Sequence, residues 1–511
     1  MSLPMLALLS VLLRMKLLTP AGLYRLLFVI CRYGINLMAL LKLAASSHGD
    51  RIALTDDRET LSYKQLLDQS ERLTVQLREH YGLGSRSKVG MLCRNHASLV
   101  KSIFAASMTG ADIYLMNADM STDQFNRLMD DHSFDLLIIE EELTTFVEQS
   151  SYTGASVRSY HDRLPAISNL IYASTDGQSK PKRKWPRAST GKLMLLTGGT
   201  TGRAKKVAHK PSLFRYLPPF SSMLTKLRLL HYSTVYIATP IYHGYGIAVL
   251  LLFVALGKKS VITAVFHAEK ACRLITEHQV EVVTVVPLMV DKMLRERAGD
   301  LKSLACIASG GAELSPRLAS EVSSKLGDVL FNLYGTSESG LNIIATPQDL
   351  KYSSNTIGQL IKGVRLKVLD SNMREVGAGE IGQFCVRRNR SVWIKTGDMG
   401  YRDERGYYFL KGRVDDMIVS AGENVYPSDL EQILFQHPLI GDAAVVGIRD
   451  EKFGQRLKAV VQLMPGVELT AEALTEWLRG RAARYQMPKE IVFVEQLAHT
   501  PLGKRDKKHL G

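Results

Sequence analysis

Short apolar runs that recur between longer helical stretches limit the possible folds more than any other feature of this sequence. Four of these runs are expected to be buried strands, at residues 88–93, 135–140, 281–287 and 304–311. Several are followed by a helix start, as at Ser315-Pro316, where an N-cap residue precedes a first-turn proline. Strands that alternate with helices in this way predict an α/β fold.

The chain is too long for one hydrophobic core, since it has 511 residues. Its character changes near Gly412, where a smaller unit begins with strands expected at residues 443–448 and 458–463. We therefore predict a large domain of β-sheets flanked by helices at residues 50–411. A small hinged α+β domain is predicted at residues 412–511.

The first 49 residues contain five basic residues and no acidic one. Their longest uncharged run, residues 1–13, is too short to span a bilayer, and no signal-peptide cleavage pattern follows. Thr19-Pro20 predicts the start of a second helix in this apolar, helical N-terminal segment (residues 1–49). The segment either contacts a membrane peripherally through residues 1–45 or covers the core of the next domain.

The formal charge of +15 favours anionic partners, such as anionic lipid or phosphorylated small molecules, although a merely solvated basic surface is the alternative. No zinc finger or RNA-binding pattern is present, so nucleic acid is not expected. The five cysteines lie far apart, which argues against disulfides and predicts a reducing compartment. We expect a cytoplasmic protein, with a possible site at the inner face of the membrane.

A glycine- and threonine-rich stretch, "LMLLTGGTTGRAKKV" at residues 193–207, follows a strand-like run. Glycines let backbone N–H groups turn toward an anion, threonine hydroxyls add donors, and Lys205 adds positive charge. These properties predict a phosphate-binding loop. It is not a Walker loop, because no glycine directly precedes the lysine.

The stretch "NLYGTSESG", residues 332–340, nearly matches the G-x-S-x-G nucleophile elbow of hydrolases. Ser339 stands where the elbow requires its second glycine. A hydrolase would also need a later Asp and His, for which Asp398 and His437 are the available residues. We therefore disfavour a hydrolase.

The two stretches and three later ones together resemble the motif series of the adenylate-forming superfamily. These motifs are the phosphate loop, "LYGTSESG", "KTGD", "GRVDD" and the terminal "TPLGK", in the family's order along nearly the whole chain. The superfamily contains acyl-CoA synthetases, adenylation domains and luciferases. "DDRETLSYKQL", "GGAELSP" and "ATPQDL" resemble its fatty-acyl-CoA synthetase branch most closely.

The resemblance implies two sets of ATP-binding residues. The loop that holds the β- and γ-phosphates would comprise Thr197, Gly198, Gly199, Thr200, Thr201, Gly202 and Lys205. Three residues depart from the family's pattern: Gly198 replaces its usual serine, Ala204 its proline and Lys206 its glycine. We nevertheless expect ATP binding to survive. The adenosine site would comprise Gly310, Gly311, Ala312, Tyr334, Gly335, Asp398 and Arg413, with the Tyr334 ring on adenine and Asp398 and Arg413 on the ribose.

Catalytic roles also follow from the resemblance. Glu338 would bind Mg²⁺, with the hydroxyls of Thr336 and Ser337 beside it. Lys504 would contact both the carboxylate and the α-phosphate during adenylation, where a fixed cation lowers the barrier. The alternative for Lys504 is a solvated basic tail.

The acyl and thiol sites are implied more weakly. His243, in "PIYHGYG", would border the acyl pocket, while the run at residues 247–257 is more consistent with a core helix. Asp415 would be the hinge, and Gly422 and Arg449 would contact coenzyme A. The loop at residues 389–392 is shorter than is usual in the family and puts handling of the acceptor in doubt.

The leading hypothesis is an ATP-dependent acyl-CoA ligase for a medium- or long-chain fatty acid. It would use Mg²⁺ and coenzyme A as cofactors and form acyl-AMP with release of pyrophosphate. One alternative is an adenylating ligase for another aryl or acyl acid, with coenzyme A or an acyl carrier protein as acceptor. Another is a non-catalytic nucleotide- or acyl-binding protein.

Overall fold

The computed structural model describes residues 19–161, 165–173, 191–198, 204–209, 221–336, 338–388, 392–420, 423–450, 454–500, 504–507 and 510. The chain divides into two compact units, Met1–Thr284 and Val285–Gly511. Each unit is described by itself. The predicted domain boundary at residue 412 lies inside the second unit and stays a prediction.

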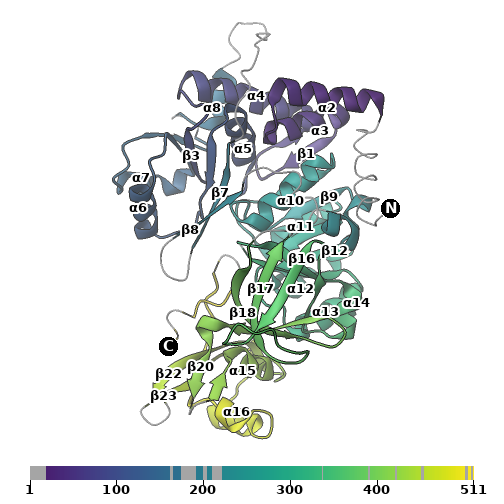
Figure 1. Cartoon of the computed structure of the whole chain (residues 1–511), viewed down its shortest axis with the longest axis vertical. Helices are drawn as coiled ribbons and strands as arrows, with labels where there is room; N and C mark the ends of the chain where they lie inside the picture. The colour runs from purple at the N-terminus through teal and green to yellow at the C-terminus, as the bar shows by residue number, and fades with distance from the viewer. Residues whose placement is uncertain are drawn as a thin grey trace. The chain divides into compact units, whose positions relative to one another are not determined.

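The first unit contains a largely parallel sheet in the order β6-β5-β3-β4-β7-β8 (Figure 1). Only the last pair, β7 with β8, is antiparallel in this sheet. The strands are β3 (Lys88–Leu92), β4 (Asp112–Leu115), β5 (Leu136–Ile139), β6 (Ala155–Arg158), β7 (Leu193–Gly198) and β8 (Ala204–His209). The strands predicted at residues 88–93 and 135–140 are therefore confirmed.

A second set of strands in this unit has the order β11-β9-β10-β1-β2. These strands are β1 (Ile52–Thr55), β2 (Thr60–Ser62), β9 (Thr234–Ile237), β10 (Lys259–Ile262) and β11 (Val282–Val285). The helices of the unit are α2 (Pro20–Tyr33), α3 (Leu37–His48), α4 (Tyr63–Glu79), α5 (Ala97–Thr109), α6 (Thr122–Asp131), α7 (Thr144–Glu148), α8 (Ile167–Ala173), α10 (Gly244–Ala255) and α11 (Ala268–Glu277), with 3-10 turns at Glu141–Leu143 and Leu229–His231.

Helix α5 shows how local chemistry fixes the position of an element in this unit. The helix is buried along its whole length, as expected for an apolar segment between sheet strands. His96 caps its start, because its Nδ1 accepts a hydrogen bond from the Leu99 N–H at 3.0 Å. Gly110 ends it in the left-handed conformation, with φ at 86°. The three residues before α5 are therefore held in a fixed geometry.

The second unit has a mixed sheet in the order β16-β17-β18-β19-β15-β14-β13-β12. Its strands are β12 (Cys306–Gly310), β13 (Leu330–Thr336), β14 (Gly340–Ala345), β15 (Thr356–Leu360), β16 (Val364–Leu369), β17 (Gly382–Arg388), β18 (Ile394–Arg402) and β19 (Tyr408–Arg413). Its helices are α12 (Pro287–Arg297), α13 (Pro316–Leu326) and α14 (Pro347–Tyr352), with a 3-10 turn at Ala298–Leu301. The predicted cap at Ser315 is confirmed, since its Oγ accepts from the Leu318 N–H at 3.2 Å.

The C-terminal part of this unit is a small α+β arrangement. Its sheet has the order β21-β20-β23-β22, with β24 parallel to β23. The strands are β20 (Ile418–Ser420), β21 (Glu423–Val425), β22 (Ile440–Asp450), β23 (Gly454–Leu463) and β24 (Glu490–Val494), and the helices are α15 (Pro427–Leu434) and α16 (Ala471–Leu478), with 3-10 turns at Val414–Asp416 and Arg484–Gln486. Its apolar core includes Leu430, Val445, Val461 and Leu474. The predicted α/β class with a small C-terminal α+β domain is confirmed.

Candidate active site

Three predicted adenosine-site residues from three different strands meet at one carboxylate. The Tyr334 hydroxyl on β13 donates to Asp398 Oδ2 at 2.6 Å. The Arg413 Nη1 group donates to Asp398 Oδ1 at 3.0 Å, and the two residues are direct partners across β18 and β19. A carboxylate has about four acceptor positions, so this one keeps room for further donors. Two adjacent ribose hydroxyls are donors of the required kind.

Burial, together with the adjacent Asp398 carboxylate, raises the pKa of Tyr334 above its usual value. The phenol therefore stays protonated and donates to the carboxylate at neutral pH. Because its hydroxyl is fixed, the ring is fixed as well. The ring is 8% exposed and belongs to a buried apolar cluster with Phe384 and Tyr408, so its stacking on adenine stays a prediction.

Glycines allow the close approach of strands around this carboxylate. Gly397 has a φ of 79°, and a Cβ atom there would lie 2.6 Å from Arg413 Nη2. At Gly335, between Tyr334 and Thr336, a Cβ atom would lie 2.5 Å from the carbonyl oxygen of Gly340. Both positions therefore require glycine to keep the strands in register.

The turn after β13 is held by the predicted Thr336 hydroxyl together with Ser339 and Asn342, which sequence reasoning did not assign to the site. Thr336 Oγ1 and Ser339 Oγ are 2.8 Å apart, and the Ser339 N–H donates to Thr336 Oγ1 at 3.1 Å. Asn342 Nδ2 donates to the same Ser339 Oγ at 2.6 Å. Ser339 and Asn342 thus shape the turn, while Ser337 lies outside the described residues. The only sequence signal for Ser339 was the failed hydrolase match.

Asp398 and His437, the two described side chains of the hydrolase alternative, are each held by other partners. Asp398 is held by Tyr334 and Arg413. His437 instead accepts the Leu439 N–H at Nδ1 over 3.2 Å and packs edge-on against Trp477. The geometry of these described residues agrees with our rejection of a hydrolase.

Glu338 lies within this turn, with its side chain exposed. Mg²⁺ is commonly held by one or two carboxylates together with substrate phosphate oxygens and water. One exposed carboxylate on the turn after Tyr334 therefore fits the predicted role of holding an ion that arrives with ATP.

A group with metal-ligand spacing lies elsewhere, among the described residues of the first unit: Cys93, His96 and Glu140. His96 Nδ1 accepts the Leu99 N–H, so the ring proton is on Nε2, which lies 2.9 Å from Glu140 Oε2 and donates to it. A metal at Nε2 would need the lone pair that this proton occupies. Burial also raises the pKa of Cys93 well above its usual value, which keeps the thiol protonated. We assign this cluster to capping of α5 and not to metal binding.

The glycine-rich loop joins two paired strands. β7 and β8 are antiparallel, with Thr197 opposite Lys205 and Gly198 opposite Ala204. Gly199, Thr200, Thr201 and Gly202 lie outside the described residues. The described backbone thus shows the pairing of the two strands that flank the predicted phosphate loop.

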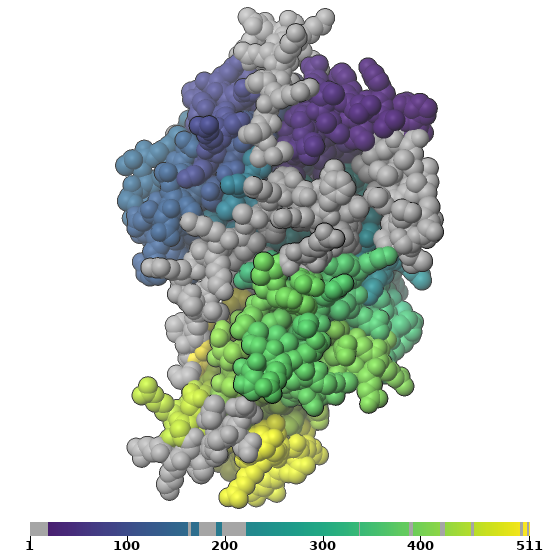
Figure 2. Space-filling model, viewed as in Figure 1, coloured from purple at the N-terminus to yellow at the C-terminus, as the bar shows by residue number. Residues whose placement is uncertain are grey.

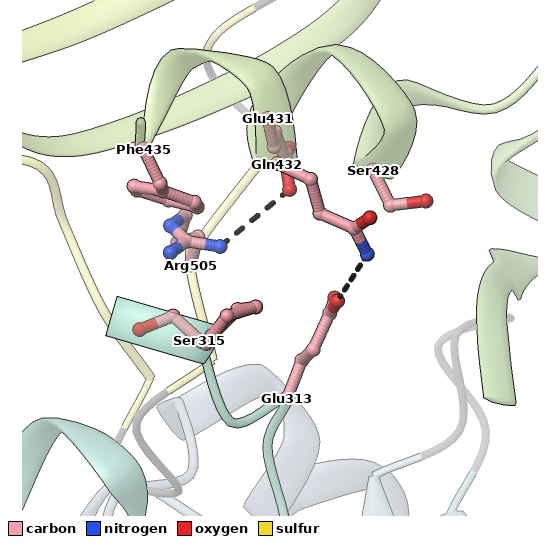
Figure 3. A pocket seen from close by; sticks show the side chains of 8 residues that line it. Glu313, Ser315, Ser428, Glu431, Gln432, Phe435 and Arg505 are labelled. Carbon is pink, nitrogen blue, oxygen red and sulfur yellow. Dashed lines mark hydrogen bonds and ion pairs between the residues drawn. The ribbon is translucent and has the colours of Figure 1, made fainter. Parts of the chain in front are cut away.

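Gly310 ends β12, Gly311 and Ala312 follow it, and Gly311 has a φ of 84°. A small pocket lies beyond it, where Gln432 Nε2 lies 3.2 Å from Glu313 Oε1 and Arg505 pairs with Glu431 at 3.5 Å (Figure 3). Its interior of about 10 Å³ has room for about one water. The pocket is therefore a packing gap and not a nucleotide site.

Lys504 is exposed, while the basic residues that follow it are anchored. Its backbone carbonyl accepts from the Thr500 N–H at 2.7 Å. Arg505 Nε donates to Asp442 at 2.8 Å, and Lys507 Nζ donates to the buried Glu431 at 2.6 Å. The described part of this terminus is thus not a loose basic tail. Of Lys504, Arg505 and Lys507, Lys504 is the residue whose side chain is exposed.

The predicted acceptor-side residues are less closely organised. Asp415 is exposed and pairs with Arg413 at 3.5 Å. Arg449 is exposed near the end of β22, and Gly422 lies outside the described residues. Beside the short loop at residues 389–392, the Arg387 guanidinium lies 4.8 Å from the centre of the Trp393 ring.

His243 lies in a loop that is tied to the sheet by residues that sequence reasoning missed. Asn95 Nδ2 donates to the Thr239 carbonyl at 3.0 Å, and its Oδ1 accepts the Ile241 N–H at 2.7 Å. The nitrogen and the oxygen of this buried side-chain amide thus both form hydrogen bonds with backbone atoms of one loop. The available signal was a polar "RNH" triplet directly after an apolar strand.

A second hydrogen-bonded contact holds the loop next to His243. The Tyr242 hydroxyl donates to Asp119 Oδ2 at 2.9 Å, and Arg94 pairs with Asp119 Oδ1 at 3.1 Å. Burial and the Asp119 carboxylate raise the pKa of Tyr242, so it remains a donor. The loop therefore reaches α10 in one defined conformation.

Comparison with known proteins identifies two regions of the chain. The AMP-binding enzyme family matches residues 41–392, and the AMP-binding enzyme C-terminal domain matches residues 429–504. The chain is similar to an indoleacetate–CoA ligase of Aromatoleum aromaticum, with 27% identity over 89% of this chain and 93% of that protein. It is also 26% identical to the medium/long-chain-fatty-acid–CoA ligase FadD8 of Mycobacterium tuberculosis, over 91% of this chain and 88% of FadD8.

Solved structures support the fold. The anthranilate CoA ligase AuaEII in complex with anthranoyl-AMP aligns with a TM-score of 0.83 and 21% identity, over 93% of this chain and 96% of that one. The chain therefore belongs to the AMP-binding enzyme family, and the enzyme class that its motifs predict, an AMP-forming acid–thiol ligase, is confirmed.

Proposed function

We propose that this enzyme activates a medium- or long-chain fatty acid as acyl-AMP and transfers the acyl group to coenzyme A. The observation that carries the nucleotide part is the meeting of Tyr334, Asp398 and Arg413 at one site. These residues come from three motifs far apart in the sequence. They provide a fixed ring and a carboxylate with free acceptor positions, which suits adenosine.

In the first step a carboxylate oxygen of the acid bonds to the α-phosphorus of ATP, and the bond to pyrophosphate breaks. Lys504 would stabilise the charge that develops on the α-phosphate, and the loop at residues 197–205 would hold the β- and γ-phosphates. Mg²⁺, held by Glu338, would neutralise phosphate charge. Thr336 and Ser337 would keep the turn that carries Glu338 in place.

In the second step the thiol sulfur of coenzyme A bonds to the acyl carbonyl carbon, the thiol loses its proton, and AMP leaves. Asp415 would be the hinge for the change between the two steps, with Gly422 and Arg449 on the thiol side. The positive net charge of the chain supports binding of a phosphorylated acceptor.

An uncharged acyl tail is supported by the segment after His243. Helix α10 contains no charged residue and begins directly after this loop. An acid with a second carboxylate would lack a partner there. An aryl acid is the second candidate, because the indoleacetate–CoA ligase is at least as similar to this chain as FadD8 is.

The decisive measurement is pyrophosphate release with ATP, Mg²⁺ and a panel of octanoate, palmitate, indoleacetate and 2-succinylbenzoate. We expect palmitate or octanoate to give the highest kcat/KM, and coenzyme A to stimulate AMP release. A preference for indoleacetate would replace our substrate proposal with the aryl one. Stimulation only by a phosphopantetheinylated carrier protein would replace coenzyme A as acceptor. ATP binding without pyrophosphate release from any acid would favour the non-catalytic alternative.

The ties on the His243 loop lead to a prediction about acid binding. We expect Tyr242→Phe to raise the KM for the acid about tenfold, because a buried hydrogen bond to a carboxylate is worth about 1.5–3 kcal/mol. The KM for ATP should stay within about twofold. Steady-state kinetics with each substrate varied in turn would measure both.

Tyr236→Phe is a matched control for this prediction. Its buried hydroxyl lies 2.9 Å from Thr263 Oγ1, away from the His243 loop. If Tyr236→Phe raised the KM for the acid as much as Tyr242→Phe does, the effect would be general loosening of the fold and our assignment would be wrong.

The cytoplasmic location of the protein also stays a prediction.

A further inference from the structure

Helix α2 exposes an apolar face that no described part of the chain covers. Pro20, Gly22, Val29 and Tyr33 do not contribute to this face: Pro20 forms the first turn, and the other three are buried. The side chains on the outer face, with their exposed fractions, are Leu23 (52%), Tyr24 (70%), Leu27 (55%) and Phe28 (46%), and Ile35 (51%) follows the helix. Leu23, Tyr24, Leu27 and Phe28 are linked by spacings of three and four residues, which places these four on one side of the helix. We call these five side chains the α2 face.

The neighbouring helix shows that this exposure is specific to α2. Helix α3 buries Met38, Leu41 and Ala44 and packs against α4, α5 and α10. The two sequence-based interpretations of residues 1–49 therefore apply to different helices. Helix α3 covers the core, whereas leucine, tyrosine and phenylalanine side chains of α2 are exposed. The N-terminal helices, in purple, lie at the surface in Figure 2.

The charges around the α2 face are positive. Helix α2 carries Arg25 and Arg32 and has no acidic residue. The Arg32 guanidinium lies 5.9 Å from the centre of the Phe28 ring. The nearby acidic residue, Glu71, accepts the Tyr33 hydroxyl at 3.0 Å on the buried side of the helix. Apolar side chains flanked by arginines complement a surface with an apolar interior and anionic headgroups.

We propose that the α2 face docks on the surface of a bilayer that contains anionic lipid. The helix would lie in the plane of the interface, with its leucines and rings among the acyl chains and its arginines at the phosphates. None of the helices that the structure describes is both long and apolar enough to span a bilayer. The docking does not depend on the proposed substrate, although a long-chain acid dissolved in the bilayer would be close at hand.

Vesicle flotation tests this proposal with the full chain and point variants. Deleting residues 1–45 would also remove most of α3, which fills the core, so a truncation would not separate docking from folding. We therefore choose Leu27→Glu/Phe28→Glu, which places two charges at the centre of the α2 face. The control is Tyr172→Glu/Val265→Glu, because these side chains are also exposed, by 61% and 44%, but lie outside the α2 face. Circular dichroism and thermal melting would show that both variants are folded.

With vesicles of phosphatidylcholine and phosphatidylglycerol, we expect the parent chain and the control to float. The Leu27→Glu/Phe28→Glu variant should lose at least about tenfold in partition coefficient. Vesicles of phosphatidylcholine alone should bind the parent more weakly. Three outcomes would overturn the proposal: no flotation of the parent, equal flotation of parent and variant, or a parent dimer that only the variant dissociates. The last outcome would assign the α2 face to a second copy of the chain.

Discussion

Pyrophosphate release is expected to fall by about 10²–10³-fold when Lys504 is replaced by alanine. Adenylation brings a carboxylate to a polyphosphate, and a positioned cation offsets this repulsion most in the transition state. Lys504 is exposed, whereas Arg505 and Lys507 are engaged with acidic partners. The ammonium group of Lys504 is therefore available to a substrate. Single-turnover measurement of acyl-AMP formation would give the rate.

Two comparisons make this prediction specific. Transfer of the acyl group from preformed acyl-AMP to coenzyme A should change by less than about threefold in Lys504→Ala, because the α-phosphate is no longer attacked in that step. Lys507→Ala removes the same charge and breaks the ion pair with Glu431, while Arg505 stays paired with Asp442, so it should lower the melting temperature and lower the adenylation rate far less than Lys504→Ala does. A normal rate in Lys504→Ala, with a lost rate in Lys507→Ala, would reverse our assignment.

Binding of ATP is expected to weaken by about 10²-fold when Asp398 is replaced by asparagine. The substitution keeps the shape but removes the carboxylate nearest the half-buried Arg413 guanidinium and leaves only the exposed Asp415 at 3.5 Å, and such losses cost about 2–5 kcal/mol. It also replaces one of the two acceptor oxygens with an amide donor. Calorimetric titration with ATP would measure the change, and Tyr334→Phe should give a smaller loss of about fivefold.

The double variant Tyr334→Phe/Asp398→Asn tests whether the two residues act as a unit. Their effects should be less than additive, because the Tyr334 hydroxyl acts through the same carboxylate. Asp403→Asn is the matched control, since Asp403 also accepts a tyrosine hydroxyl, that of Tyr352, at 2.9 Å. Equal loss of ATP affinity in Asp403→Asn would show that the effect is not local to the nucleotide site.

Much of the fold could be predicted because its signals are local. The strand at residues 304–311 is an apolar run, and the start of α13 has a serine cap followed by proline. Tyr334, Asp398 and Arg413 could be placed in one predicted site because three short motifs each carry a distinctive glycine beside one of these side chains, and the structure brings the three together. These features are encoded within a few neighbouring residues.

The ties on the His243 loop could not be predicted in the same way. Asn95 contacts residues 144 and 146 positions away, and Tyr242 contacts a residue 123 positions away. Neither the pairing nor its burial leaves a periodic pattern in the sequence. The sequence of residues 1–49 shows their amphipathic character. It does not show which helix covers the core and which is exposed, because that depends on which helix face contacts α4 and α5.

The ion pairs of Arg505 and Lys507 also set the effective concentration of the Lys504 ammonium group at a reaction centre. If the chain were free after Leu497, Lys504 would be seven residues along a flexible tether and would spread over roughly 15 Å. Instead, the ion pairs of Arg505 and Lys507 confine its backbone, and the ammonium group explores only the reach of one side chain. A confined charge occupies a much smaller volume, so its local concentration is higher and it loses less entropy when it meets a substrate. Glu431 and Asp442, which never need to touch a nucleotide, thereby contribute to how often the lysine is in place.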